Sequence, residues 1–522
     1  MHTWLNTSIP QQVYRPEQVR DFEAEAAQRC GIDLWTLMQR AGAAAWEALA
    51  NQLPQSAAIT VLCGSGNNGG DGYVLASLAK QAGFAVRVCA SGFPASDDAR
   101  RALQRWLDVD GEVEPLQDWQ DGECDWLVDA LLGTGLQRDV SGELFECIAS
   151  VNDSGLPVLS IDVPSGLHAD TGSALGIAVQ ARKTVTFVGM KRGLLTGDAA
   201  NYVGELAFSD LGIQREFRLL TEPAAWWLQP VQLQHDLPGR LAVCQKGDFG
   251  HVLIIGGSRG MAGAARMAAT AALRVGAGKV TVICEPGNEA IVGQQPEIMV
   301  VAADANEALA ERLLEQASVI AIGPGLGQSD WGRAWWQKFC QRSYERDLTA
   351  VVDADGLNLL AQYAGEQGMQ PAEGMIYTPH PGEAARLLRA QVTEIQANRW
   401  LAADTLREQL QGTVVLKGTG TVVADGDEQT FAVCTQGTPA MATAGMGDIL
   451  TGIIAGLLAQ RQSDGFPTSV AAIARLAVLL HACAGEQATR RFGGISRGLL
   501  ATDLLTELPA LASSQNGQYP NI

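Results

Sequence analysis

The sequence predicts an α/β protein of two domains, each built around a parallel sheet covered by helices. Short apolar runs rich in β-branched residues recur along the chain, and segments of helical periodicity separate them. The alternation breaks between residues 213 and 240, where prolines stand among Gln, Glu and Trp residues without any strand pattern. We therefore expect a first domain at residues 1–218, a linker at 219–234 and a second domain at 235–510.

The apolar runs give the expected strands of each domain. Strands buried on both faces of a parallel sheet appear in a sequence as short, nearly continuous apolar segments. In the first domain they lie at residues 59–63, 86–90, 126–130, 158–163 and 184–188. In the second domain they lie at residues 252–255, 280–284, 319–322, 350–352, 375–377 and 413–416.

The composition is that of a globular, acidic protein. The 522 residues include 37 basic and 57 acidic ones, a net charge of −20, which argues against a nucleic-acid partner. The 10 cysteines form no C-x-x-C pair or zinc-ligand spacing, so we expect reduced thiols. The N-terminus has no signal-peptide pattern, and the apolar runs at 449–458 and 471–480 are too short or too interrupted to span a bilayer. We expect a cytoplasmic protein without a membrane partner.

Glycines and polar side chains follow the first strand of the first domain. A G-x-G-x-x-G pattern begins at Gly64, where backbone N–H groups can bind a pyrophosphate, and we expect a helix at 73–81. Asn67, Asn68 and Asp71 are more polar groups than phosphate binding needs and indicate a ligand or a cation. An ordinary glycine-rich turn is the other interpretation. The next strand has no acid at its end to bind a ribose, which argues against a dehydrogenase.

Acidic residues stand at two further strand ends of this domain. Asp129 ends the run at 126–130, and Asp162 ends the run at 158–163. Because the carboxyl ends of parallel strands share one edge of a sheet, we expect these acids and the glycine-rich loop to line one crevice. For each Asp alone, capping of a turn or helix is the alternative.

In the second domain, glycines and an acid stand at a helix N-terminus. No P-loop or protein-kinase motif occurs, but Gly445, Gly447 and Asp448 open an apolar helix. The N–H groups and the helix dipole at such a place stabilise a transferring phosphoryl group, and Asp448 can accept the proton of an attacking hydroxyl. The alternative is that Asp448 only favours the helix N-terminus electrostatically.

Other strand ends of the second domain supply further candidates. Lys417 and the Gly-Thr residues after it are placed to contact nucleotide phosphates, and glycines at 323–327 let a phosphate approach the backbone. His380 stands between two prolines and either binds substrate or has a structural role. Asp353 and Asp355 either bind magnesium or only turn the chain.

The motifs of the first domain resemble a known family. The segments 67–71, 131–135 and 161–166 are similar, in this order, to those of YjeF N-terminal domains, the NAD(P)H-hydrate epimerases. The resemblance implies a Rossmann-like three-layer domain that interconverts the R and S forms of hydrated NADH and NADPH (NADHX and NADPHX). Asp162 suits this chemistry as a base and as the counter-charge to an imine-like cation.

The resemblance also implies site residues of the first domain. It implies that Asn68, Asp129 and Ser165 hold a potassium ion. Hard oxygen ligands suit an alkali cation, although they do not identify which one. The residues implied to line the substrate site are Asn67, Asn68, Gly69, Gly70, Asp71, Gly133, Thr134, Gly135, Leu136, Gln137, Arg138, Asp139 and Asp162.

The motifs of the second domain resemble YjeF C-terminal domains, the ADP-dependent NAD(P)H-hydrate dehydratases with a ribokinase-like α/β fold. The resemblance implies that the S-hydrate, activated by Asp448, attacks the β-phosphoryl group of ADP, that AMP leaves, and that phosphate is then expelled, with Mg²⁺ present. Met446 departs from the small residue usual between the glycines. The implied residues are Ala264, Gly327, His380 and Asp448 for the hydrate, and Lys417, Gly418, Thr419, Gly420, Thr421 and Gly447 for the nucleotide.

Together the two halves resemble the bifunctional nicotinamide nucleotide repair proteins, and a homo-oligomer is expected. The main alternative is a kinase for a small sugar or vitamin alcohol fused to a Rossmann-like binding module, because Gly445–Asp448 also serves that chemistry. A binding module without chemistry and an NAD-dependent dehydrogenase are further alternatives. The spacing of residues does not distinguish ADP from ATP, or NADHX from NADPHX.

Overall fold

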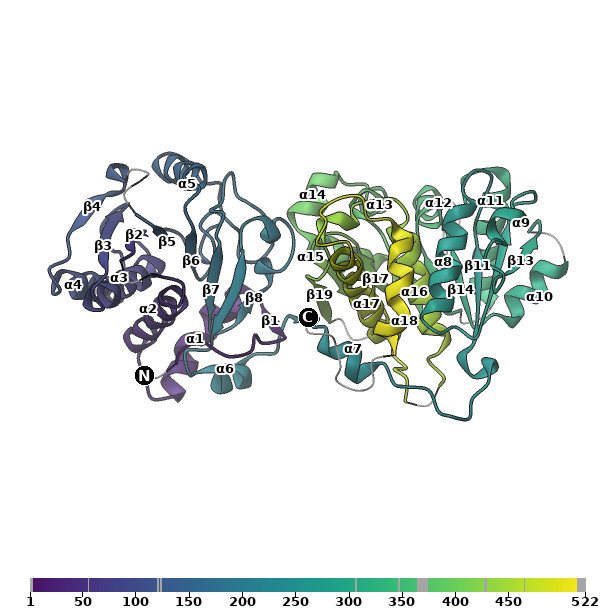
Figure 1. Cartoon of the computed structure of the whole chain (residues 1–522), viewed down its shortest axis with the longest axis horizontal. Helices are drawn as coiled ribbons and strands as arrows, with labels where there is room; N and C mark the ends of the chain where they lie inside the picture. The colour runs from purple at the N-terminus through teal and green to yellow at the C-terminus, as the bar shows by residue number, and fades with distance from the viewer. Residues whose placement is uncertain are drawn as a thin grey trace. The chain divides into compact units, whose positions relative to one another are not determined.

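The computed structural model describes residues 3–54, 56–119, 122, 124–305, 308–345, 348–363, 374–426, 430–463 and 465–513. Within it the chain forms two compact units, Met1–Trp227 and Leu228–Ile522 (Figure 1). The division falls inside the segment 213–240 that breaks the alternation of strands and helices. This segment nevertheless contains a strand, β10 (Ala225–Trp227), so the expectation of none there was wrong. β10 is only three residues long, too short to show as an apolar run.

The first unit contains a parallel sheet of seven strands among its described residues, in the order β4-β3-β2-β5-β6-β7-β9. All five predicted apolar runs are strands of this sheet. The first unit also contains a smaller group of strands, in the order β10-β1-β8. The strands are β1 (Gln12–Tyr14), β2 (Ala58–Cys63), β3 (Ala85–Ala90), β4 (Val113–Pro115), β5 (Trp126–Ala130), β6 (Val158–Ile161), β7 (Lys183–Phe187), β8 (Met190–Lys191) and β9 (Glu205–Ser209).

The helices of the first unit pack on this sheet and bury an alanine-rich core. The strand order reverses between β2 and β5, which leaves a crevice at the carboxyl ends of these two strands. The glycine-rich loop follows β2, so the fold delivers it to that crevice. The helices are α1 (Pro16–Arg29), α2 (Leu34–Ala50), α3 (Asn67–Gln81), α4 (Asp97–Leu107), α5 (Glu143–Asp153) and α6 (Gln214–Leu220).

Helix α3 begins at Asn67 and not at residue 73, which corrects the sequence prediction. The polar motif therefore lies in the first turns of a helix. Its glycines are needed for close packing: a Cβ on Gly69 would collide with the Gly64 carbonyl, and one on Gly72 would lie 2.7 Å from the Ala130 Cβ. Sequence reasoning took them as loop residues because glycine is unfavourable within a helix.

The second unit contains a sheet in the order β13-β12-β11-β14-β15-β16-β17-β18-β19. The strands from β13 to β17 are parallel, and β18 and β19 add antiparallel at one edge. All six predicted runs are strands, and β13 and β19 were not predicted. The strands are β11 (His251–Ile255), β12 (Lys279–Cys284), β13 (Met299–Ala302), β14 (Val319–Ile322), β15 (Ala350–Val352), β16 (Met375–Tyr377), β17 (Thr413–Leu416), β18 (Thr421–Ala424) and β19 (Phe431–Cys434).

Helices α8, α16, α17 and α18 gather over this sheet and supply most of its large apolar core (Figure 1). They run over Ala262–Arg274, Met446–Ala459, Val470–Arg491 and Leu504–Ala512. The remaining helices are α7 (Val231–Asp236), α9 (Glu289–Val292), α10 (Ala308–Gln316), α11 (Asp330–Glu345), α12 (Asp355–Tyr363), α13 (Pro381–Leu388), α14 (Val392–Ala397) and α15 (Arg399–Leu410).

Helix α17 is long and apolar enough to cross a membrane by length and composition, which the sequence analysis did not expect. The unbroken 22-residue helix extends well beyond the apolar run at 471–480. However, 72% of its apolar window is buried inside the unit, as in a core helix.

The cysteines form no disulfide. Most of the ten are buried or half-buried. Cys30 in the first unit and Cys244 in the second are exposed.

Candidate functional site

The first unit has a cavity of about 720 Å³ at the carboxyl ends of β2, β5 and β6. Two predicted residues, Gly69 and Gly70, do not line this cavity. Gly69 packs against Gly64, and Gly70 packs against Met38 and Ala99. Asp139, Asp129 and Ser165 are also not among the lining residues. The predicted residues that the cavity brings together are Asn67, Asn68, Asp71, Gly133, Thr134, Gly135, Leu136, Gln137, Arg138 and Asp162.

Asp129 lies buried beneath this cavity in a network of hydroxyl groups. Its carboxylate accepts hydrogen bonds from the Ser160 hydroxyl (2.7 Å), and from the backbone N–H (2.8 Å) and hydroxyl of Ser165. Burial raises the pKa of Asp129, although the serine hydrogen bonds oppose that rise. Asp129 therefore fixes Ser165 in place instead of reaching the cavity itself.

Asn68 carries the clearest sign of a missing ligand. Its amide Nδ2 donates to the Leu132 carbonyl (2.9 Å), which the Ser165 hydroxyl also approaches (3.2 Å). Its Oδ1 is buried and has no hydrogen-bond partner among the described residues. A buried polar atom without a partner is costly, and oxygen atoms gathered in this way are what an alkali cation requires. Asn68, Asp129 and Ser165 thus fit the potassium site implied by the sequence.

Asp162 directly follows β6 with a left-handed backbone, φ 64°. Its Oδ1 accepts from the Thr186 hydroxyl (3.1 Å), from the Phe187 N–H (3.4 Å) and from Lys191. No hydrogen bond to Oδ2 is found in the part of the chain that the structure describes. A non-glycine residue in this conformation is unusual and is often found at functional sites.

Lys191 holds Asp162, and sequence reasoning missed it. The lysine is 1% exposed, and its Nζ also donates to the Thr186 hydroxyl (3.1 Å) and the Phe187 carbonyl (2.8 Å). All three of its donors are thus used, which fixes the ammonium group. In the sequence, the one indication of this role is that Lys191 directly follows the apolar residue Met190.

Glu23 from α1 also lines the cavity and was missed as well. Burial raises its pKa to about 7, with Lys191 lowering and Asp162 raising it. The pKa of Asp71 is raised well above its usual value by burial and by the charges of Asp162 and Glu23. The cavity therefore holds carboxyl groups of different acidity, as proton transfer requires.

The second unit places Asp448 in the first turn of α16, behind Gly445, which has a left-handed backbone (φ 92°). Asp448 is half-buried, so its carboxyl group remains accessible. Burial raises its pKa to about 7, Asp353 and Asp355 add to the rise, and Lys417 opposes it. The backbone N–H groups of the first turn and a poised carboxylate thus lie together, as the sequence predicted.

Lys417 lies next to this helix N-terminus, in a group of acids. Its Nζ donates to Asp353 (2.7 Å) and lies 3.9 Å from Glu383, while Asp353 also accepts from Thr451 (2.8 Å). Burial alone would lower the pKa of Lys417, but Asp353, Glu383 and Asp448 raise it overall. A Cβ on Gly447 would lie 3.2 Å from this ammonium group, so the glycine brings the loop backbone close to the charge.

His380 caps helix α13. Its Nδ1 accepts from the backbone N–H groups of Gly382 (2.9 Å) and Glu383 (3.4 Å), and its Nε2 lies 3.4 Å from the Glu383 carboxylate. Burial, Lys417 and Arg386 lower the pKa of His380, and burial raises the pKa of Glu383 to about 7. The histidine has the structural role that the sequence left open, and its half-exposed ring still borders the site.

The two remaining hydrate candidates lie where the loops after β11 and β14 meet. A Cβ on Gly325 would lie 3.1 Å from that of Ala264, and one on Gly327 would lie 2.7 Å from the Ser258 hydroxyl. Gly327 donates its N–H to Asp355 (2.9 Å). Asp355 and Asp353 are therefore both hydrogen-bonded within the protein. No group of three His, Cys, Asp or Glu suited to a metal ion occurs among the described residues.

The predicted nucleotide residues Lys417–Thr421 form the turn between β17 and β18. Gly418 and Gly420 have positive φ, and the Thr421 hydroxyl closes the turn on the Gly418 carbonyl (2.8 Å). Arg399 supports the turn from beneath by donating to the carbonyls of Leu416 (3.0 Å) and Lys417 (3.1 Å). Burial lowers the pKa of Arg399 to about 10. Arg399 was not predicted, because it looks like a surface residue of α15. Thr419 is exposed at the tip.

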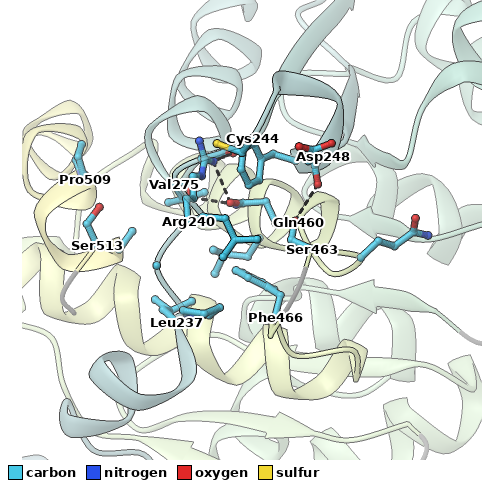
Figure 2. A pocket seen from close by; sticks show the side chains of 18 of the residues that line it. Leu237, Arg240, Cys244, Asp248, Val275, Gln460, Ser463, Phe466, Pro509 and Ser513 are labelled. Carbon is cyan, nitrogen blue, oxygen red and sulfur yellow. Dashed lines mark hydrogen bonds between the residues drawn. The ribbon is translucent and has the colours of Figure 1, made fainter.

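Another cavity, of about 870 Å³, lies at the opposite end of α16 (Figure 2). Arg240 stacks over the Phe249 ring (3.5 Å), donates to the Gly276 carbonyl and reaches Gln460 (3.1 Å). None of the predicted site residues lines this cavity. The rise of the helix separates it from Asp448 by about 20 Å, so it is not part of the site.

Two family models match the chain. The one described as YjeF-related protein N-terminus matches residues 35–193, and the one described as NAD(P)H-hydrate dehydratase matches residues 252–510. The bifunctional NAD(P)H-hydrate repair enzyme Nnr of Coxiella burnetii (strain RSA 493 / Nine Mile phase I) is 44% identical over 508 residues, 96% of this chain and 99% of that protein. The chain belongs to the family of bifunctional NAD(P)H-hydrate repair enzymes.

Other members of this repair family are similarly close. The Nnr enzyme of Escherichia coli (strain K12) is 40% identical over 514 residues, 97% of this chain and 95% of that protein. The structure of the ADP/ATP-dependent NAD(P)H-hydrate dehydratase of Bacillus subtilis, co-crystallized with ATP/Mg²⁺, matches with 30% identity and a TM-score of 0.45, over 54% of this chain and 96% of that one. Lys191 lies within the matched part of the first unit of this repair enzyme, whereas Glu23 precedes it.

Proposed function

We propose that the two units of this repair enzyme divide the work between two reactions. The first unit interconverts the R and S forms of NADHX and NADPHX. The second unit dehydrates the S form to NADH or NADPH at the expense of ADP, which yields AMP and phosphate. The observation that carries the proposal is the position of Asp448, in the first turn of α16 and beside the half-buried ammonium group of Lys417.

In the second unit, the carboxylate of Asp448 takes the proton from the C6 hydroxyl of the hydrate. The hydroxyl oxygen bonds to the β-phosphorus of ADP, and the bond to the bridging oxygen breaks, with its electron pair leaving on AMP. The ring nitrogen then expels the phosphate from C6, and loss of a proton from C5 restores the dihydronicotinamide. The N–H groups around Gly445 and Gly447 and the charge of Lys417 stabilise the phosphoryl group during transfer.

The turn between β17 and β18 suits the phosphates of the nucleotide. The glycines at 418, 420 and 447 allow phosphates to approach the backbone near Lys417, so we place the AMP part along Lys417–Thr421. Mg²⁺ neutralises phosphate charge when it is bound. The described residues offer it no cluster of three acidic, histidine or cysteine ligands, so we expect it to arrive on the nucleotide, and we assign it no step.

In the first unit, the residues around Asn68 fit a potassium ion. Asn68 Oδ1 and the Ser165 hydroxyl would hold it, with Asp129 supplying the negative charge behind them. A bound cation there would hold an anionic part of the substrate near the N-terminus of α3. Asp162, fixed through Oδ1 by Lys191, turns a free carboxylate oxygen toward proton transfer at the hydrated carbon.

The test is direct. Purified protein is incubated with mixed R and S hydrate, Mg²⁺ and either ADP or ATP, and the absorbance of the restored dihydronicotinamide is followed, with a protein-free control for spontaneous reaction. We expect nucleotide-dependent recovery of NADH, with AMP and phosphate formed in equal amounts when ADP is used. Stable phosphorylation of another alcohol without recovery of NADH would support the small-molecule kinase instead.

A further inference from the structure

Glu23 is an acidic group of the epimerase cavity to which the chemistry above gives no role. It lies on α1 on the same face as Val19, Ala26 and Ala27, all of which are buried. Residues four apart share a face of a helix, so Glu23 occupies a position where an apolar side chain is expected. No hydrogen bond of its carboxyl group is found among the described residues. Hydrogen bonding within the protein therefore does not explain why an acid occupies this position of α1.

The neighbouring charges leave Glu23 poised for proton transfer. Lys191 does not pair with it by hydrogen bond, because its three donors go to Asp162, Thr186 and Phe187. With a pKa of about 7, Glu23 carries a proton in about half of the molecules at neutral pH. The charged or titratable side chains that line the cavity are Arg20, Glu23, Asp71, Asp98, Arg138, Asp162 and Lys191.

The two candidate acids reach the cavity from different parts of the fold. Glu23 comes from α1, whereas Asp162 follows β6 and is held by Lys191 from β8. Both side chains line the same cavity of about 720 Å³. Inversion at a carbon requires a group to leave on one face and to return on the other, so a single acid is not enough to serve both steps.

We propose that Glu23 is the second proton-transfer group of the epimerase site and acts with Asp162 on the hydroxyl of the hydrate. This proposal rests on the proposed epimerase function of the first unit. Glu23 donates its proton to the C6 hydroxyl, the C6–O bond breaks, and its electron pair leaves with the water formed. The lone pair of the ring nitrogen forms the C=N bond of a cation that faces the Asp162 carboxylate.

Water then adds to the other face of C6, and Asp162 accepts the proton that this water loses. The ring nitrogen regains its lone pair, and the opposite epimer is complete. One proton has moved from Glu23 to Asp162, and exchange of protons with solvent water returns the pair to its starting state before the next turnover. No oxidant, reductant or further reactant is needed. Epimerisation from R to S and from S to R each requires one proton shared between Glu23 and Asp162. The rates in both directions therefore fall when the pH rises far enough to ionise both carboxyl groups.

The experiment compares the full chain with Glu23→Gln, Glu23→Asp and, as a matched control, Glu25→Gln. Glu25 lies on the same helix but is exposed, and its ion pair within the described part of the chain is with Arg29. Interconversion of separated R and S hydrate is followed without nucleotide, as a function of pH, and ADP-dependent dehydration by the same samples reports on folding. We expect Glu23→Gln to lower kcat for epimerisation by about 10²- to 10⁴-fold with little change in KM.

Each outcome decides the proposal. In the wild type and in Glu25→Gln the epimerisation rate falls above about pH 7, and in Glu23→Gln the residual rate lacks this limb. Partial recovery of rate and limb in Glu23→Asp supports the role, and this variant replaces Glu23→Gln if the latter does not fold. A Glu23→Gln enzyme with unchanged kcat and pH profile overturns the proposal alone. Failure of the wild type to epimerise overturns the proposed function, and the role of Glu23 with it.

Discussion

In each unit a lysine lies among several carboxyl groups: Lys191 is buried and Lys417 is half-buried. Lys191 pairs with Asp162, and Lys417 pairs with Asp353. Burial raises the pKa of Glu23 in the first unit and of Asp448 in the second unit, each to about 7. In each unit the lysine lowers the pKa of this neighbouring carboxyl group, but the effect of burial is larger.

At the level of single residues, we predict that Asp448→Asn lowers the rate of dehydration by about 10²- to 10⁴-fold, because the hydroxyl loses its proton acceptor. Epimerisation by the first unit stays unchanged. The measurement is NADH recovery from S-hydrate with ADP. Asp330→Asn is the matched control, since Asp330 also lies in the first turn of a helix, α11, but is exposed. Equal loss in both variants would remove Asp448 from the mechanism.

The same substitution should stabilise the second unit above neutral pH. The folded-state pKa of Asp448, about 7, exceeds its unfolded value of 3.8, so the folded state binds the proton more tightly, and stability falls as pH rises from about 4 to about 7. Asp448→Asn removes this loss. We expect the melting temperature to rise by a few degrees near pH 8 and little below about pH 4. Calorimetry of the full chain can assign the transition to the second unit by the shift that ADP causes in the wild type.

At the level of elements, the strands at the centre of each sheet were predictable because they are buried on both faces. Such strands must be apolar throughout, so β2, β5 and β11 stand out in the sequence. The two- and three-residue strands β8 and β10 are too short to show a pattern. Their positions follow from tertiary packing, which local sequence does not encode.

The site was predicted where chemistry and strand ends coincide, and missed elsewhere. Asp162 and Asp448 stand in glycine-rich motifs at the ends of strands or the start of helices. Glu23, in contrast, lies on an amphipathic helix, where a charged residue normally marks the solvent face. Arg399 supports the nucleotide turn from a helix that follows a different strand. Glu23 and Asp162 are far apart in the sequence, and Arg399 lies 18 residues before Lys417, so only the folded chain reveals these positions.

We predict that the packing of α16 on α8 depends on Gly452. A Cβ at this position would lie 2.8 Å from the carbonyl carbon of Ala268, which is backbone and cannot move aside easily. Gly452→Ala should therefore destabilise the second unit by about 1–3 kcal/mol. Gly263→Ala on α8 is the control, because a Cβ there meets nothing within 4 Å and should be tolerated. Chemical unfolding monitored by dehydratase activity distinguishes the two.

At the level of the whole molecule, the fusion of two units matters because hydration produces both epimers. We predict that Asp162→Asn leaves dehydration of S-hydrate intact but abolishes its supply from the R form. With mixed hydrate and ADP, NADH recovery should then stop when the S form is consumed. Addition of a separate Asp448→Asn chain should restart it. Recovery of the full amount by Asp162→Asn alone, faster than the spontaneous reaction, would contradict this division.

The expected homo-oligomeric state and cytoplasmic location stay predictions. Light scattering of the purified chain at several concentrations tests the first, and fractionation of cells tests the second. The cavity of the first unit is lined by residues of that unit.

The distribution of thiols offers a practical handle. Because Cys30 and Cys244 are the exposed cysteines and fall in different units, mild maleimide treatment should attach one fluorophore to each. Energy transfer between a donor and an acceptor introduced in this way would then report, in native protein and without any engineered residue, whether nucleotide or hydrate draws the halves of the chain together.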